Sequence, residues 1–187
     1  MIQDRLARIS QRMAVVTLWL IIGMLVLNAA TWLFPKLGSV EGGYGISFSL
    51  SDRLISSAWV DVTGLAWWQT LGAIVLSSIP LVVLSMGLLN LRALFRNYAA
   101  GNYFSSGSAI YMEKLGWAVN LWVVLTFLCE PLLGLWVTLR EPVGQRFMTL
   151  SFDSSGIVAI FLATCIILIA RILRRATEIN TENQQFV

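Results

Sequence analysis

Four long runs with almost no charged residues dominate this sequence. A helix needs about 20 apolar residues to cross the roughly 30 Å hydrocarbon core of a membrane. Only 12% of the residues are charged and 57% are hydrophobic, whereas soluble domains carry roughly 25% charged residues. The runs therefore predict an all-α membrane protein, a single domain over residues 1–187, with four transmembrane helices at residues 13–35, 70–91, 115–139 and 154–172.

The distribution of Lys and Arg predicts how these helices are threaded. Basic residues near the ends of membrane spans favour the cytoplasmic side. Of 13 basic residues, nine lie before the first span, between the second and third, or from Arg171 at the end of the fourth span onward. The N- and C-termini are therefore expected in the cytoplasm. None of the basic clusters combines its charge with stacking aromatic residues, so direct binding of nucleic acid is not expected.

The two connections on the opposite side, residues 36–69 and 140–153, carry a pattern of their own. Tyr44–Leu50 and Arg146–Asp153 alternate between apolar and small or polar residues, which is the periodicity of strands. Residues 54–65 repeat at helical spacing and are followed by two tryptophans, as in a helix that lies in the membrane interface. These patterns predict a small extracytoplasmic cap of two short strands and an interfacial helix.

Glu130 is the one ionisable residue deep inside a predicted span. A charge at that depth is costly, so its side chain is expected to face other helices rather than lipid. Two hypotheses stay open: Glu130 joins helices by hydrogen bonds, or it couples protons or cations in a small transporter or channel subunit. By depth, its candidate partners form an intramembrane polar cluster of Glu130, Asn28, Ser77 (or the adjacent Ser78) and Thr164.

Several kinds of chemistry lack the residues that they need. The chain has no histidine, which excludes histidine metal ligands and Ser–His–Asp triads. Its two cysteines, Cys129 and Cys165, both lie in spans and are interpreted as core residues. No phosphate-binding loop or nucleophile motif is present. We therefore expect no enzyme activity, with no catalytic residue, cofactor site or metal site.

The connection between the second and third spans predicts a helix, a turn and a second helix. Gly101 suits a helix end with a positive φ angle, and Ser105 or Ser106 suits the start of the next helix. This block and the tail Ala176–Val187 resemble a family of bacterial four-span membrane proteins catalogued as domain of unknown function 2975. The resemblance rests on the residues that we take as a candidate cytoplasmic interaction motif: Leu94, Phe95, Arg96, Tyr98, Gly101 and Phe104.

The resemblance implies a bacterial inner-membrane protein without an established activity. Some relatives are encoded beside a small helix-turn-helix regulator, which implies a cytoplasmic regulator as partner, in addition to the lipid bilayer itself. The favoured interpretation is a non-enzymatic regulatory or interaction protein. The alternative is a small transporter or channel subunit that uses Glu130 and forms a homo-oligomer, because four helices enclose little aqueous volume.

Overall fold

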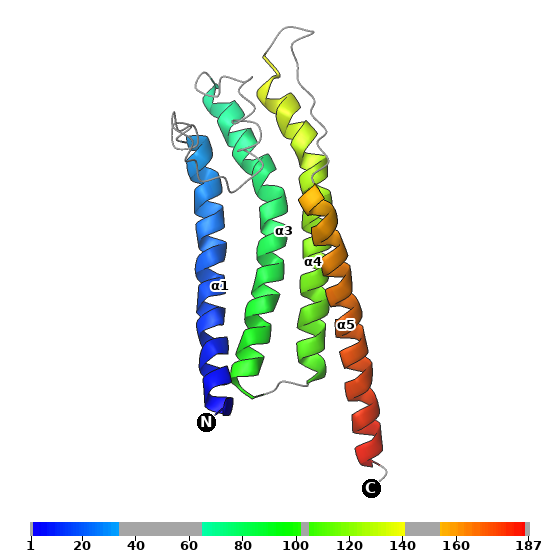
Figure 1. The fold of residues 1–187 in the computed structure, drawn as a ribbon. Helices are drawn as coiled ribbons and strands as arrows, with labels where there is room; N and C mark the ends of the chain where they lie inside the picture. The colour runs from blue at the N-terminus through cyan, green and yellow to red at the C-terminus, as the bar shows by residue number, and fades with distance from the viewer. Residues whose placement is uncertain (1, 34–64, 102–104, 141–153, 186–187) are drawn as a thin grey trace. The chain divides into compact units, whose positions relative to one another are not determined.

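The computed structural model describes residues 2–33, 65–101, 105–140 and 154–185. These residues form four helices: α1 (Ile2–Leu33), α3 (Trp67–Ala99), α4 (Ser106–Val137) and α5 (Ser154–Gln185) (Figure 1). All regular structure within the described ranges is helical. The two strands and the interfacial helix expected in the cap fall in residues 34–64 and 141–153, outside the described residues.

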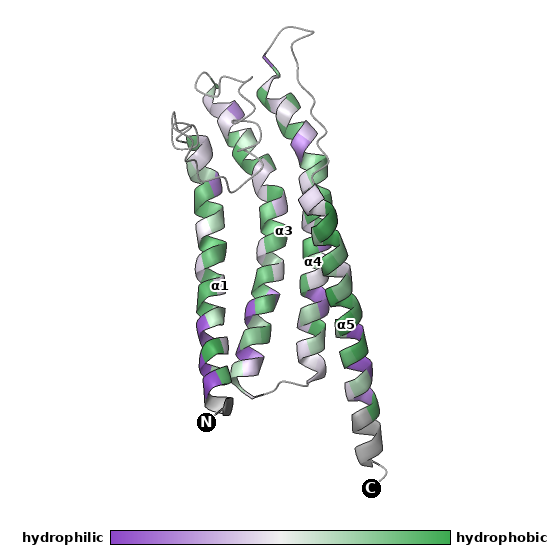
Figure 2. Cartoon of the chain, viewed as in Figure 1, coloured by the Kyte–Doolittle hydropathy of each residue, from purple (hydrophilic) through white to green (hydrophobic). Residues whose placement is uncertain are grey.

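Each of the four helices is long and apolar enough to cross a membrane. The shortest apolar segment, Ser154–Ile179 of α5, has 26 residues, which corresponds to about 39 Å at the helical rise per residue. Apolar residues cover most of each helix in Figure 2, and many large apolar side chains are exposed, among them Trp19, Val75 and Phe161. Such exposure fits a lipid environment, so the chain is a membrane protein with four apolar helices.

The helices extend beyond the spans predicted from the charge-free runs. The first helix begins at Ile2 rather than near residue 13, and the last continues to Gln185 rather than ending near residue 172. The added turns are rich in Arg, Gln, Glu, Leu and Ala, which are good helix formers in water. Loss of apolar character therefore ends the membrane span without ending the helix.

The chain divides into two compact units. Unit 1 contains Met1–Ile21, Val83–Trp122 and Ser154–Val187, and unit 2 contains Ile22–Val82 and Val123–Asp153. Three helices contribute to both units, whereas α5 belongs to unit 1 alone. Each unit is described separately below.

In unit 1, α4 and α5 pack closely at a glycine. A Cβ atom on Gly116 would lie 2.5 Å from Cγ1 of Ile167 and 2.9 Å from the carbonyl oxygen of Ala163. Small residues allow membrane helices to approach in this way. The same two helices are joined by an ion pair of 2.9 Å between Nε of Arg171 and Oε1 of Glu113. Together these contacts fix the antiparallel register of α4 and α5.

The turn between α3 and α4 is capped on both sides. Gly101 has a φ angle of +84°, and its N–H donates to the carbonyl of Tyr98 at 3.1 Å. Ser105 Oγ accepts a hydrogen bond of 3.2 Å from the N–H of Ser108 in the first turn of α4. Both predictions for this turn, the positive φ angle at Gly101 and a serine cap at the start of α4, are confirmed.

Candidate functional site

Unit 2 contains a polar network between α1 and α3. The side-chain amide of Asn28 donates to Oγ of Ser77 at 3.1 Å and to Oγ of Ser78 at 3.2 Å. The indole N–H of Trp32, one turn further along α1, donates to the same Ser77 oxygen at 3.1 Å. The hydroxyls of Ser77 and Ser78 in turn donate to the carbonyl of Ile74 at 3.2 and 2.6 Å. Hydrogen bonds from side chains of α1 to serine hydroxyls of α3 thus join the two helices.

The direction of these bonds leaves one buried acceptor unused. Because both serine hydroxyls donate to Ile74, the Asn28 amide has to present its NH₂ group to them. Its carbonyl oxygen Oδ1 is buried and has no hydrogen-bond partner in the described part of the structure. Asn28 is only 2% exposed, so this acceptor does not reach solvent. Buried acceptors without a hydrogen-bond partner are uncommon in folded proteins.

Glu130 lies on the packed face of α4 in the same unit. Its side chain is 4% exposed. Leu133 and Val137 follow at three and seven residues, and both belong to the apolar core of unit 2 with Trp32, Ala73 and Cys129. Residues at these spacings share one face of a helix. Glu130 therefore places its carboxyl group among the helices, as the sequence argument expected for an intramembrane acid.

A second interaction in unit 2 centres on Trp136 of α4. Its indole N–H donates to the carbonyl of Gln69 at 3.0 Å. Its ring occupies the space that a side chain on Gly72 would need, and it meets the ring of Trp68 edge-on at a centroid distance of 5.9 Å. Arg140 lies 5.9 Å from the Trp68 ring centroid, within the range of a cation–π contact. These contacts hold α4 against the start of α3.

The structure brings together some members of the predicted polar cluster and not others. It joins Asn28 to Ser77, and it buries Glu130 in the same unit. Thr164 belongs to unit 1, where its side chain is exposed and its hydroxyl donates to the carbonyl of Ile160 on its own helix at 2.8 Å. Trp32 is the member that sequence reasoning missed. Its position four residues after Asn28 was the available signal, because that spacing places both on one face of α1.

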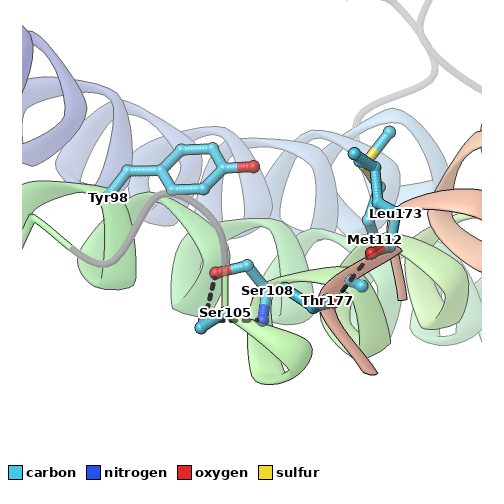
Figure 3. A pocket seen from close by; sticks show the side chains of 7 residues that line it. Tyr98, Ser105, Ser108, Met112, Leu173 and Thr177 are labelled. Atoms are coloured by element: carbon cyan, nitrogen blue, oxygen red, sulfur yellow. Dashed lines mark hydrogen bonds between the residues drawn. The ribbon is translucent and has the colours of Figure 1, made fainter. Parts of the chain in front are cut away.

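Unit 1 contains a small cavity beside the α3–α4 turn, here called the turn pocket (Figure 3). Its volume is about 20 Å³, which is room for about one water molecule. The hydroxyls of Ser105 and Ser108 share a hydrogen bond of 3.0 Å at its edge, and Thr177 Oγ1 donates to the carbonyl of Leu173 at 2.7 Å. The cavity is lined by Tyr98, Ser105, Ser108, Ala109, Met112, Leu173 and Thr177.

The candidate interaction motif divides into inward-facing and exposed residues. Leu94 is buried and Tyr98 lines the turn pocket. Phe95 is half-buried and Arg96 is exposed. Gly101 forms the turn itself, and Phe104 lies outside the described residues. Part of the motif therefore shapes the turn, and Arg96 remains accessible on its surface.

Among the described residues, no group of three or more His, Cys, Asp or Glu side chains could hold a metal ion. The chemistry that the arrangement offers is hydrogen bonding inside unit 2 and an exposed positive charge at Arg96 beside the turn of unit 1.

Comparison with known families identifies the chain. The model of the family described as "Protein of unknown function (DUF2975)" matches residues 54–187, well over half of the sequence. The chain belongs to the DUF2975 family. The family resemblance inferred from the turn and tail is thus confirmed. No curated protein and no solved structure matched this DUF2975 protein. The match covers α3, α4, α5 and the whole turn pocket, whereas α1 with Asn28 and Trp32 precedes the matched residues.

Proposed function

We propose that this DUF2975 protein is a non-enzymatic regulatory protein of the inner membrane, which binds a cytoplasmic protein through the α3–α4 turn. The observation that carries the proposal is the placement of two motif residues at the end of α3, where Tyr98 lines the turn pocket and Arg96 is exposed. A recognition surface benefits from a backbone that is already fixed before the partner arrives, because less conformational entropy is lost on binding. The two helix ends that flank residues 102–104 meet this condition through the cap at Gly101 and the cap at Ser105.

The charge distribution supports a cytoplasmic position for the turn. Arg96 is exposed on the last turn of α3, and α5 beside it carries three exposed arginines. Basic residues of this density at helix ends favour the cytoplasmic side. A cytoplasmic regulator could then approach Arg96 directly. The family resemblance supports a helix-turn-helix regulator as the partner, because such genes lie beside those of some relatives.

Reversing one charge at the turn is expected to abolish capture of the partner. The purified full-length chain, carrying Arg96→Glu, is tested for co-purification with candidate helix-turn-helix regulators encoded beside its gene. Lys114→Glu is the matched control, because it makes the same charge change at an exposed position further along α4. We expect at least a tenfold loss of bound regulator for Arg96→Glu and less than a threefold loss for the control. Equal capture by both variants, or no capture by the unmodified chain, would refute the proposal.

A second candidate function is supported by unit 2. A buried carboxyl group at Glu130 and the unused acceptor of Asn28 belong to the same unit. Buried acids and free acceptors inside membrane proteins are typical of proton and cation pathways. This second proposal makes the protein a small transporter or channel subunit, in which Glu130 takes up and releases the coupled ion.

Flux measurements separate the second candidate from the first. If Glu130 couples transport, proteoliposomes containing the chain are expected to show a pH-driven proton or cation flux that Glu130→Gln lowers at least tenfold. Glu113→Gln is the matched control, since Glu113 forms an ion pair with Arg171 in unit 1. A flux no greater than that of empty liposomes, or an equal loss in both variants, would count against a transport role.

A further inference from the structure

The first turns of α1 carry three arginines on one face. Arg5, Arg8 and Arg12 are all exposed, and with Ile9 they line a shallow open groove. Their spacing of three and four residues brings neighbouring guanidinium groups to one side of the helix. Over the seven residues from Arg5 to Arg12 the helix rises about 10 Å. The groove is therefore a short basic surface at the very start of the apolar helix.

Arg5 and Arg12 are less compensated by negative charge than the arginines at the other basic helix end. On α5, Arg171 pairs with Glu113, and both Arg174 and Arg175 pair with Glu178. In contrast, no ion pair among the described residues involves Arg5 or Arg12. Asp4 is the one acidic residue in the sequence of α1. An anion from outside the chain would balance the positive charge of Arg5 and Arg12.

The same side of α1 continues as exposed apolar surface. Val15, Val16 and Trp19 follow directly, and Trp19 is 68% exposed. Figure 2 shows the change along α1, from hydrophilic residues near the N-terminus to hydrophobic residues beyond them. An occupant that matches both parts needs a negative head group and a long apolar body. A soluble acidic peptide matches the arginines alone.

We propose that this face of α1 binds an anionic phospholipid. Its phosphate is held by the guanidinium groups of Arg5 and Arg12, which donate hydrogen bonds to phosphate oxygens in a planar fork, and Arg8 between them adds positive charge. Its acyl chains lie along Val15, Val16 and Trp19. From Arg12 to Trp19 the helix rises about 10 Å, which fits within one leaflet, about 15 Å or half of the hydrocarbon core. The site is separate from the turn pocket, which residues of α3, α4 and α5 line.

Binding of phosphatidylglycerol by the full-length chain tests the proposal. Lipid is titrated into the detergent-solubilised protein, and the bound fraction is measured by native mass spectrometry. The double variant Arg5→Gln/Arg12→Gln is expected to bind about 30-fold more weakly, from the usual contribution of a basic residue beside an anionic lipid surface. The matched control Arg174→Gln/Arg175→Gln removes as many charges from arginines that pair with Glu178, and it is expected to change binding less than threefold. Circular dichroism verifies that both variants keep their helices.

Two further comparisons complete the test. Phosphatidylcholine, which has the same phosphate but no net charge, is expected to bind at least tenfold more weakly than phosphatidylglycerol. Inorganic phosphate added in excess over lipid is expected to leave lipid bound, because it lacks the apolar body that contacts Val15, Val16 and Trp19. Equal binding of the two lipids, displacement by inorganic phosphate, or equal weakening in the two double variants would each overturn the proposal.

Discussion

Replacing Gly116 with alanine is expected to lower the free energy of unfolding by about 1–2 kcal/mol, whereas the same replacement at Gly23 is expected to raise it by about 0.5–1 kcal/mol. Both changes improve helix propensity equally. At Gly116 the new Cβ would meet the backbone carbonyl of Ala163 at 2.9 Å, so α5 has to move away from α4. At Gly23 nothing lies within 4 Å, and the methyl group is accommodated without displacement.

The opposite signs make the comparison decisive. Unfolding is followed by circular dichroism during titration of the detergent-solubilised chain with sodium dodecyl sulfate, and the two variants are measured in parallel with the unmodified protein. If Gly116→Ala were as stable as Gly23→Ala, α4 and α5 would not be packed at this glycine. A Gly116→Leu variant is expected to show a still larger loss, because the longer side chain requires more separation of the helices.

Truncating Leu133 to alanine is expected to cost about 2–5 kcal/mol, while truncating its neighbour Leu132 is expected to cost less than about 0.5 kcal/mol. Leu133 is fully buried at 0% exposure in the core of unit 2, and Leu132 is 51% exposed. In a membrane, helices associate largely through van der Waals packing. A cavity at Leu133 therefore lowers the free energy of unfolding directly. The two substitutions remove the same atoms and differ only in the face of α4 that loses them.

Cys129 offers a local measurement of this effect. It is buried in the same core as Leu133, while Cys165, the other cysteine, belongs to unit 1. In a Cys165→Ser background, the rate of labelling by a thiol-reactive dye reports the opening of unit 2 alone. Leu133→Ala is expected to accelerate labelling of Cys129 at least tenfold, and Leu132→Ala is expected to leave it nearly unchanged. Similar rates in both variants would contradict the assigned core.

The number of apolar helices was predictable from sequence, and their ends were less so. A charge-free run indicates which residues of a helix lie in lipid, and such a run can be found from composition alone. Helix ends depend on propensity and capping. For this reason the end of α3 just before Gly101 was predicted correctly, whereas the charge-free runs gave no bounds for the extensions of α1 to Ile2 and of α5 to Gln185. The cap expected in the long connections lies outside the described residues.

The candidate site shows the limits of an argument from depth. Depth along a helix places residues at one level of the membrane but leaves their angular position open. It placed Asn28 and Ser77 at one level, where the structure joins them by a hydrogen bond. Thr164 was placed there too, yet its side chain is exposed and bonded to its own helix. Trp32 was not predicted as a member because a tryptophan in an apolar run is expected to make apolar contacts. Its indole N–H was not expected to donate a hydrogen bond to another helix.

The first helix contributes to two of the features described above, although it precedes the residues that the family model matches. Residues 54–187 match the DUF2975 family, and α1 precedes them. Even so, α1 supplies Asn28 and Trp32 to the polar network of unit 2 and three arginines to the proposed lipid site. The turn pocket, by contrast, lies entirely within the matched residues. Partner binding is therefore proposed for residues inside the family match, whereas lipid binding is proposed for residues that precede it.

The division of the chain into units also bears on the order in which it is made. Unit 2 ends at Asp153, and its core and polar network draw only on α1, α3 and α4. A chain emerging from the ribosome presents its N-terminal segments first. All of unit 2 is therefore synthesised, and its contacts can form, while α5 is still inside the ribosome. The last helix then completes unit 1 by docking against a glycine that is already in place.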